Sequence, residues 1–125
     1  MIRIILATIL VVALTFPNIS EAKSRKYPMY CGAYLLELPT PEGGRATIAM
    51  GGGYRTIQID PNLRGDLRKV VLLHECAHMK YNTTDEKFAD CYALKRAGRA
   101  PSLLRAMARR FGNYRVQQYI NSCGD

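Results

Sequence analysis

The chain contains no tryptophan, only two histidines, and fewer acidic than basic residues. It has ten Asp and Glu residues and 18 Lys and Arg residues, which gives a formal net charge of +8. There is no internal repeat and no GxxxxGKS/T, GxGxxG or GxSxG motif, so nothing indicates a phosphate loop, a dinucleotide-binding fold or a serine-hydrolase elbow. With 48% hydrophobic and 22% charged residues over 125 positions, the composition is that of one globular domain.

No apolar run has the length of a typical membrane-spanning helix. The longest, Ile4–Phe16, follows Arg3 and ends before Pro17, whereas a spanning helix needs about 20 apolar residues. A positive start, a run of this length and the small residues of Ser20-Glu21-Ala22 are typical of a signal peptide. We therefore expect residues 1–22 to be cleaved and residues 23–125 to form a single domain, secreted or periplasmic. An uncleaved membrane anchor is the alternative.

The four cysteines form no CxxC pair, which argues against a Cys-rich zinc site and a thioredoxin-type motif. An even number of cysteines in a small exported chain indicates two disulfides. A free, buried Cys76 is the alternative.

The remaining sequence predicts an α+β fold, in which a small β-hairpin or sheet precedes a buried helix and further helices. Gly51-Gly52-Gly53 separates two predicted strands and is suited to a hairpin turn. The segment 33–38 could be a strand or a short helix. The predicted strands cover 46–50 and 54–59; the predicted helices run from about 63 or 66 to 79, from the turn at 82–85 to 97, from 101 to about 112, and from 114 to 122.

The most informative motif is His74-Glu75-Cys76-Ala77-His78, an HExxH sequence in the most apolar predicted helix. Residues four apart share one helix face, so the two imidazoles can converge on one metal ion. Glu75 is displaced by about 100° around the helix, which places its carboxylate beside the metal as a candidate base. Both histidines of the chain are used in this motif.

A catalytic zinc site usually has a third protein ligand. The pattern HExxHxxGxxH is excluded, because Tyr81 and Thr84 stand where it requires Gly and His. The next predicted helix offers Glu86 and Asp90 as an ExxxD pattern. Over roughly residues 57–98, the chain therefore resembles the gluzincins, HExxH metallopeptidases with a downstream Glu ligand.

This resemblance implies zinc bound by His74, His78 and Glu86, with Glu75 as the catalytic base of a peptidase. It also implies that Asp90 accepts a hydrogen bond from His74, which would fix the ring's tautomer. The connection from His78 to Glu86 is short, so the two helices must form a tight hairpin. The strand 54–59 would be the sheet edge that pairs with a peptide or protein substrate; an ordinary interior strand is the alternative.

Glu86 has a competing interpretation. Thr83-Thr84-Asp85-Glu86 matches a capping box, in which Glu86 folds back onto the backbone N–H of Thr83. In that case Asp85 or Asp90 would have to be the third ligand.

The resemblance also suggests a disulfide pairing. If Asp90 contacts His74, the two helices are close enough for a Cys76–Cys91 bridge, and Cys31–Cys123 would join the ends of the domain. Sequence alone allows three pairings.

The C-terminal third is basic, with seven cations and no acidic residue from Lys95 to Arg115. These cations could bind an anionic envelope surface or could simply be the solvated side of helices. No nucleic-acid motif is present, and we expect a monomer. Candidate donors for a tetrahedral oxyanion are Tyr92, Tyr114, Arg115 and Tyr119. A non-catalytic, zinc-stabilised and disulfide-stapled basic binding module is the alternative to an enzyme.

Overall fold

Four short strands form one mixed sheet in the part of the chain that the computed structural model describes, residues 27–48 and 54–124. They are β1 (Met29–Tyr30), β2 (Ala33–Glu37), β3 (Gly44–Thr47) and β4 (Thr56–Ile59), in the order β1-β2-β4-β3. β2 is parallel to β4, whereas β1 is antiparallel to β2 and β3 is antiparallel to β4. The segment 33–38 is therefore a strand, and the expected α+β class is confirmed.

One expectation about the sheet is wrong: β4 is not an edge strand. It pairs with β2 on one side and with β3 on the other. β2 belongs beside β4 because its Ala33 and Leu35 extend the apolar layer that Ile57 begins. The edge strand next to β4 is β3, which starts two residues before the predicted strand and ends at Thr47; β1 is the opposite edge. The predicted Gly51–Gly53 turn lies outside the described residues.

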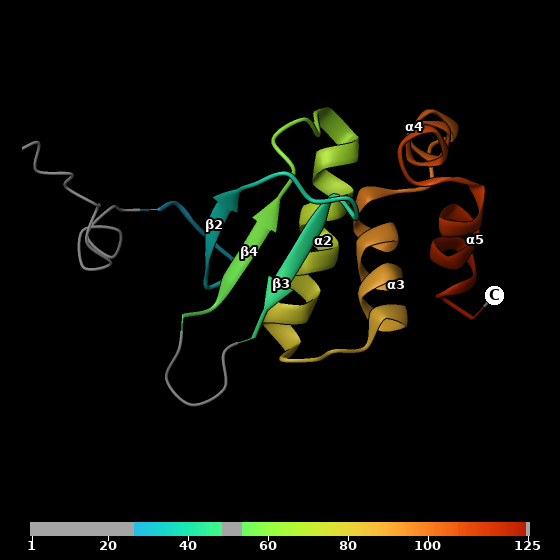
Figure 1. Ribbon diagram of the computed structural model, residues 1–125. Coiled ribbons are helices and arrows are strands. Elements are labelled where there is room, and N and C mark those ends of the chain that lie inside the picture. Colours follow the sequence, from blue (N-terminus) through green and yellow to red (C-terminus); the bar gives the residue numbers. More distant parts are fainter. Residues whose placement is uncertain (1–26, 49–53, 125) are drawn as a thin grey trace, which may run out of the picture.

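Four helices follow the sheet, close to their predicted bounds. They are α2 (Gly65–Tyr81), α3 (Glu86–Ala97), α4 (Pro101–Phe111) and α5 (Asn113–Asn121). Figure 1 shows the sheet on one side of α2, α3 on its other side, and α4 and α5 beyond α3. α2 is thus the central, buried helix that its apolar sequence predicts.

The core lies between the sheet and α2 and continues among the helices. Ile57 and Ile59 are fully buried on the inner face of β4, while Thr56 and Gln58 alternate with them on the outer face. Met79 of α2 packs against Ile57, and Leu94 and Met107 carry the core into α3 and α4. The sheet therefore covers one side of α2, and the other helices cover a second side. The polar site residues of α2 lie between these two buried sides.

α2 and α3 form the tight hairpin that the short connection requires. α2 ends at Asn82, which adopts a left-handed conformation (φ 49°) and donates its backbone N–H to His78 O. Asp85 caps α3, because its side chain accepts a hydrogen bond from the Phe88 N–H at 3.1 Å. The chain reverses direction within residues 82–85.

Two disulfides are present, but they do not pair as expected. The bridges are Cys31–Cys76 and Cys91–Cys123, with Cα separations of 5.5 and 4.9 Å. Although α2 and α3 pack closely, Cys76 is turned toward the β1–β2 turn, where Cys31 lies, and Cys91 is turned toward the end of α5. Each bridge therefore ties a site helix to a segment near one end of the domain.

Two disulfides are consistent with an oxidising, extracytoplasmic location. Among the described residues, no helix has the length and apolarity needed to cross a bilayer. The predicted signal peptide, residues 1–22, lies outside the described residues.

Candidate metal centre

The hairpin of α2 and α3 brings the side chains of His74, His78 and Glu86 together. His74 Nε2 lies 2.9 Å from Glu86 Oε2, and His78 Nε2 lies 3.1 Å from Glu86 Oε1. The two Nε2 atoms are 3.2 Å apart. One donor atom from each residue lies within 4.8 Å of the others, a cluster that could hold a metal ion.

The orientation of His78 is fixed by the turn that ends α2. Its Nδ1 lies 2.8 Å from the carbonyl oxygen of Thr83. A carbonyl can only accept a hydrogen bond, so Nδ1 must carry the proton and the lone pair of Nε2 faces the cluster. The left-handed Asn82 makes this contact possible by redirecting the chain.

His74 is oriented by a carboxylate from α3. Its Nδ1 lies 2.8 Å from Asp90 Oδ1, as the resemblance implies, and both side chains are buried. Burial alone lowers the pKa of His74, but the contacts with Asp90 and Glu86 outweigh it and raise the pKa to about 9. A metal ion could take the place of the proton that His74 Nε2 shares with Glu86.

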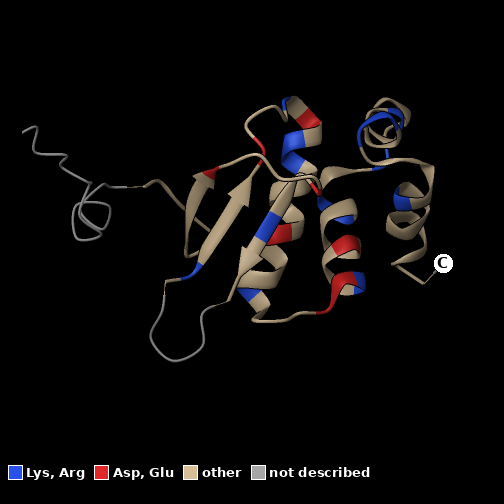
Figure 2. Ribbon diagram, viewed as in Figure 1, with Lys and Arg blue, Asp and Glu red and all other residues tan. Residues whose placement is uncertain are grey.

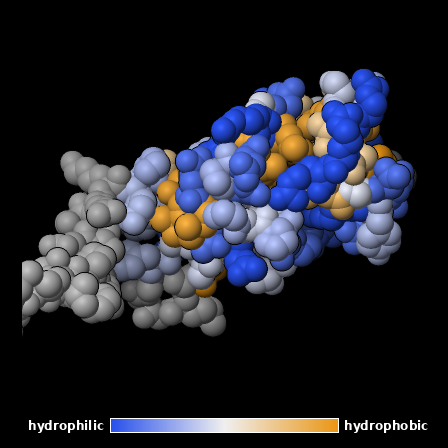
Figure 3. Space-filling model, turned by 45° about the horizontal axis from the view of Figure 1, so that its top comes forward, coloured by the Kyte–Doolittle hydropathy of each residue, from blue (hydrophilic) through white to orange (hydrophobic). Residues whose placement is uncertain are grey.

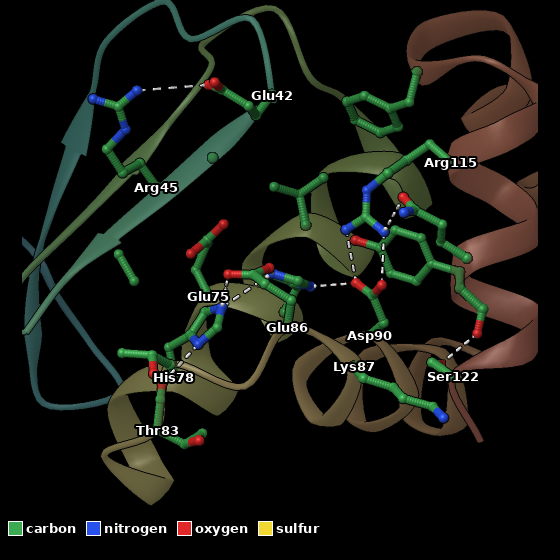
Figure 4. Close-up of a pocket in the computed structure, with 18 of the residues that line it drawn as sticks. Glu42, Arg45, Glu75, His78, Thr83, Glu86, Lys87, Asp90, Arg115 and Ser122 are labelled. Atoms are coloured by element: carbon green, nitrogen blue, oxygen red, sulfur yellow. Dashed lines mark hydrogen bonds and ion pairs between the residues drawn. The ribbon is translucent and has the colours of Figure 1, made fainter. Parts of the chain in front are cut away.

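Asp90 is in turn bound by Arg115 of α5. The Arg115 NH1 and NH2 groups donate to the two oxygens of Asp90 at 2.6 and 2.7 Å. Burial opposes ionisation of Asp90, but the hydrogen bonds from Arg115 and His74 prevail and lower its pKa. Figure 4 shows this carboxylate between the guanidinium and the histidine cluster.

Glu75 lies beside the cluster and is not part of it. It is 6% exposed, and its carboxylate points toward β3 (Figure 4). There it accepts a hydrogen bond from the Ala46 N–H. Burial raises the pKa of Glu75, while the neighbouring histidines oppose that rise. Gly44 of β3 makes room for it, since a Cβ there would meet Glu75 Oε1 at 3.2 Å and Val71 Cγ1 at 2.7 Å.

The cluster opens into a groove of about 1080 Å³. β3 forms one wall and α5 the other, with Thr83 and Lys87 near one end. The Glu86 side chain is 70% exposed into this groove, whereas the side chains of His74 and His78 are 6% and 7% exposed. The histidines thus form the floor of the site, and its open side faces the groove.

The capping-box interpretation of Glu86 is wrong. Asp85 caps α3, and the Thr83 hydroxyl accepts from the Asp85 N–H at 3.1 Å. Glu86 is therefore free to face the histidines. Asp85 is not part of the cluster, and Asp90 contacts His74 at the nitrogen that faces away from it.

The four candidate oxyanion donors are separated by the fold. Tyr114 and Tyr119 line the groove, and the Tyr119 ring centre lies 5.9 Å from that of His74. Arg115 also lines the groove, but both its terminal nitrogens are bound to Asp90. Tyr92 lies elsewhere, in an aromatic cluster with Tyr81 and Phe88.

Three features of the site could not be recognised from sequence patterns. The carbonyl of Thr83 acts through its backbone, so its residue type says nothing. Gly44 matters through its close approach to α2, which depends on the sheet order. Arg115 was a candidate only as a basic residue and as an oxyanion donor, and its pairing with Asp90 spans 25 residues.

Comparison with protein-family models, curated proteins and solved structures finds no match for this chain. The donor set therefore has to be judged by its own chemistry. Two imidazoles and one carboxylate are a set that suits a divalent transition metal and matches known three-ligand zinc sites. Both imidazoles have their outer nitrogen engaged, as metal-binding histidines almost always do. The residues present fit a metal ion.

Proposed function

We propose that this protein is an exported zinc-dependent hydrolase, a small metallopeptidase of gluzincin-like design. The observation that supports it most is the convergence of His74, His78 and Glu86 at the floor of a groove, with the Glu75 carboxylate beside them. A purely structural zinc site normally has four protein ligands. Here the described residues supply three, and the open side faces the groove.

Zinc bound at this site would polarise a substrate carbonyl and lower the pKa of the attacking water. Glu75 would accept a proton from the attacking water and pass it to the leaving amine, since its carboxylate lies in the groove beside the cluster. The Ala46 N–H holds the Glu75 carboxylate on the β3 side. Tyr119 and Tyr114 are the groove residues that could donate to the oxyanion.

The groove is shaped to hold an extended peptide. β3 pairs with β4 on one side, and no other described strand covers its second edge. A peptide strand could therefore pair with the backbone of β3 directly beside Glu75. On the opposite wall, Tyr114, Gln117, Gln118 and Asn121 form an uncharged polar stripe at helical spacing along α5.

The test compares the zinc-loaded protein with Glu75→Gln on a broad library of unfolded peptides. The amide fills the same volume and is not a ligand, so the variant should keep one zinc per chain. It should lose nearly all hydrolysis, because an amide cannot accept the proton. Glu37→Gln, at an exposed position of β2 outside the groove, is the matched control and should keep both zinc and hydrolysis.

Two results would contradict the proposal. One is a Glu75→Gln variant that hydrolyses peptides as fast as the parent protein. The other is a zinc-loaded parent that cleaves nothing in the library, which would favour the binding module with a structural metal.

The basic C-terminal helices suggest where such an enzyme would act. Arg105 and Arg109 are exposed on α4, and no acidic residue is present between Cys91 and Gly124. Figure 2 shows basic residues along α4, all of them arginines, and Figure 3, in which the top of the molecule comes forward, shows mostly hydrophilic residues with apolar patches between them. We propose that this face attracts an anionic envelope surface. Arg105→Glu with Arg109→Glu should abolish sedimentation with anionic lipid vesicles; unchanged sedimentation would contradict this.

A further inference from the structure

The carboxylate of Asp90 is held from two sides, by helices that come from different parts of the chain. On one side, its Oδ1 lies 2.8 Å from His74 Nδ1. On the other, Arg115 binds both oxygens at 2.6 and 2.7 Å. Asp90 is 3% exposed, so little water can replace either partner. A two-point guanidinium contact fixes both the position and the rotation of a carboxylate.

Arg115 is itself held in place. Its guanidinium lies over the ring of Tyr119, 4.3 Å from the ring centre, one turn further along α5. Its NH1 also lies 3.4 Å from Gln118 Oε1. The guanidinium therefore has its face and its edge occupied before any ligand arrives.

A covalent bond fastens the two helices that carry this ion pair. Cys91 directly follows Asp90 on α3, and its disulfide partner Cys123 lies just after α5. α5 thus contacts α3 through the ion pair near its first turn and through the disulfide just beyond its last.

We propose that α5 is a positioning clamp for the metal centre. Arg115 fixes the Asp90 carboxylate, and Asp90 thereby fixes the plane of the His74 ring, so that Nε2 faces the donor atoms of His78 and Glu86, which would hold a metal ion with it. Arg115 is a positioning residue, because both its terminal nitrogens are bound to Asp90 and it acts on the site through that carboxylate. The clamp rests on the metal site proposed above, but it does not require that the site be catalytic.

The expected consequence is a change in metal affinity. Groups that orient a metal-binding histidine from behind usually contribute 10–100-fold to affinity. Arg115→Ala should therefore weaken zinc binding by about 10–100-fold. Arg115→Lys should restore part of that loss, because an ammonium can neutralise Asp90 but cannot hold both oxygens in one plane.

The experiment measures the zinc dissociation constant of the full chain, with its disulfides intact, by competition with a chromophoric chelator. Arg109→Ala on α4 is the matched control, since it removes the same charge from an exposed position, and its affinity should equal that of the parent. The visible spectrum of the cobalt(II)-loaded protein gives a second measurement, which responds to ligand geometry. We expect a changed spectrum for Arg115→Ala and an unchanged one for Arg109→Ala.

Zinc affinity within twofold of the parent, with the parent cobalt spectrum, would overturn the clamp and leave the pair a stabilising contact only. Should Arg115→Ala not fold, Arg115→Gln keeps a hydrogen-bond donor toward Asp90 and is judged by the same criteria. If the parent binds zinc tightly but cleaves no peptide, the peptidase proposal is refuted. The zinc affinities of the Arg115 variants still decide whether the clamp exists. Normal cleavage together with unaltered affinity in Arg115→Ala would refute the clamp alone.

Discussion

At the scale of single residues, helix capping and metal binding fall to two different residues in the first turn of α3. The sequence had offered both roles for Glu86. Asp85 accepts the Phe88 N–H and caps the helix, while Glu86, the next residue, faces the two histidines. Contact with His74 lowers the pKa of Glu86, so it stays ionised well below neutral pH. The two carboxylates should therefore respond differently to removal.

We predict that Glu86→Ala loses tight zinc binding, because a metal ligand is removed. Its folding stability should change little, because the Glu86 side chain is exposed. Asp85→Ala should keep its zinc affinity and lose roughly 0.5–2 kcal/mol of folding free energy through the missing cap. Zinc titration and urea unfolding of the metal-free proteins measure the two effects. The assignment fails if Asp85→Ala is the variant that loses zinc.

A second residue-scale prediction concerns Gly44. A side chain at this position would press on Val71 and on the carboxylate of Glu75. Gly44→Ala should therefore cost roughly 1–3 kcal/mol of stability, as overpacked sites do, and should displace Glu75. Peptide hydrolysis should fall more than zinc affinity does.

Thr47→Ala, at an exposed position of the same strand, is the control for Gly44→Ala and should change neither property. Equal activity and stability of Gly44→Ala and Thr47→Ala would show that β3 does not press on the active helix.

At the scale of elements, the two disulfides hold the site helices to the rest of the domain. Cys76 lies between His74 and His78 on α2, and its partner Cys31 is in the β1–β2 turn, 45 residues away. Closing a loop of that length restricts the unfolded chain strongly. The bridge also ties the first strands of the sheet to α2, which carries both histidines.

We expect the double variant Cys31→Ser/Cys76→Ser to lose about 2–4 kcal/mol of folding free energy. Urea unfolding measures the loss, and peptide mapping without reduction identifies the bridges in the parent. A mapped peptide that joins Cys76 to Cys91 would contradict the fold described here.

At the scale of the whole molecule, the sheet and the C-terminal helices are joined by a second buried ion pair. Asp60, just after β4, accepts hydrogen bonds from the Asn62 N–H and from Arg110 of α4, both at 2.9 Å. Arg110 also donates to the carbonyls of Thr40 and Pro41. One arginine thus connects α4 to the β2–β3 loop and to the end of β4, which lie at the same end of the sheet.

This pair makes stability depend on pH. The hydrogen bond from the Asn62 N–H lowers the pKa of Asp60 against the opposing effect of burial, and Arg110 lowers it further. A carboxyl whose pKa is lowered by folding adds stability above its unfolded pKa of about 3.9, and that stability is lost as pH falls through the folded value.

Asp60→Asn should therefore be less stable than the parent at neutral pH, and the difference should shrink below about pH 4. Asp66→Asn, an exposed position in the first turn of α2, is the control with the same charge change. Unfolding midpoints between pH 2 and 7 measure the effect, and a difference that persists unchanged at pH 2 would contradict it.

Local patterns were sufficient to predict the helices and the residues that come together as a possible metal-binding group. The spacing of His74, Glu75 and His78 is a property of one helix, and Glu86 and Asp90 share one face of the next. Such relations depend on periodicity, which the sequence carries directly. The short turn at 82–85 already required that the two helices be antiparallel neighbours.

Relations between distant segments could not be predicted in the same way. Nothing local says that β2 lies beside β4, which makes β3 the edge next to Glu75. The predicted Cys76–Cys91 pairing was wrong, because the close packing of α2 and α3 does not determine the direction in which each cysteine side chain points. The contact of Arg115 with Asp90 likewise depends on how α5 folds back onto α3.

We propose that His74, His78 and Glu86 hold one zinc ion at the floor of the groove. The most direct test is a crystal structure of the zinc-loaded protein with anomalous diffraction data on both sides of the zinc edge. We predict one zinc per chain, bound by both Nε2 atoms and by the Glu86 carboxylate, at about 2.0–2.2 Å, with the fourth position facing the groove. An ion held by other residues, a fourth protein ligand closing the site, or an iron signal in its place would contradict the account.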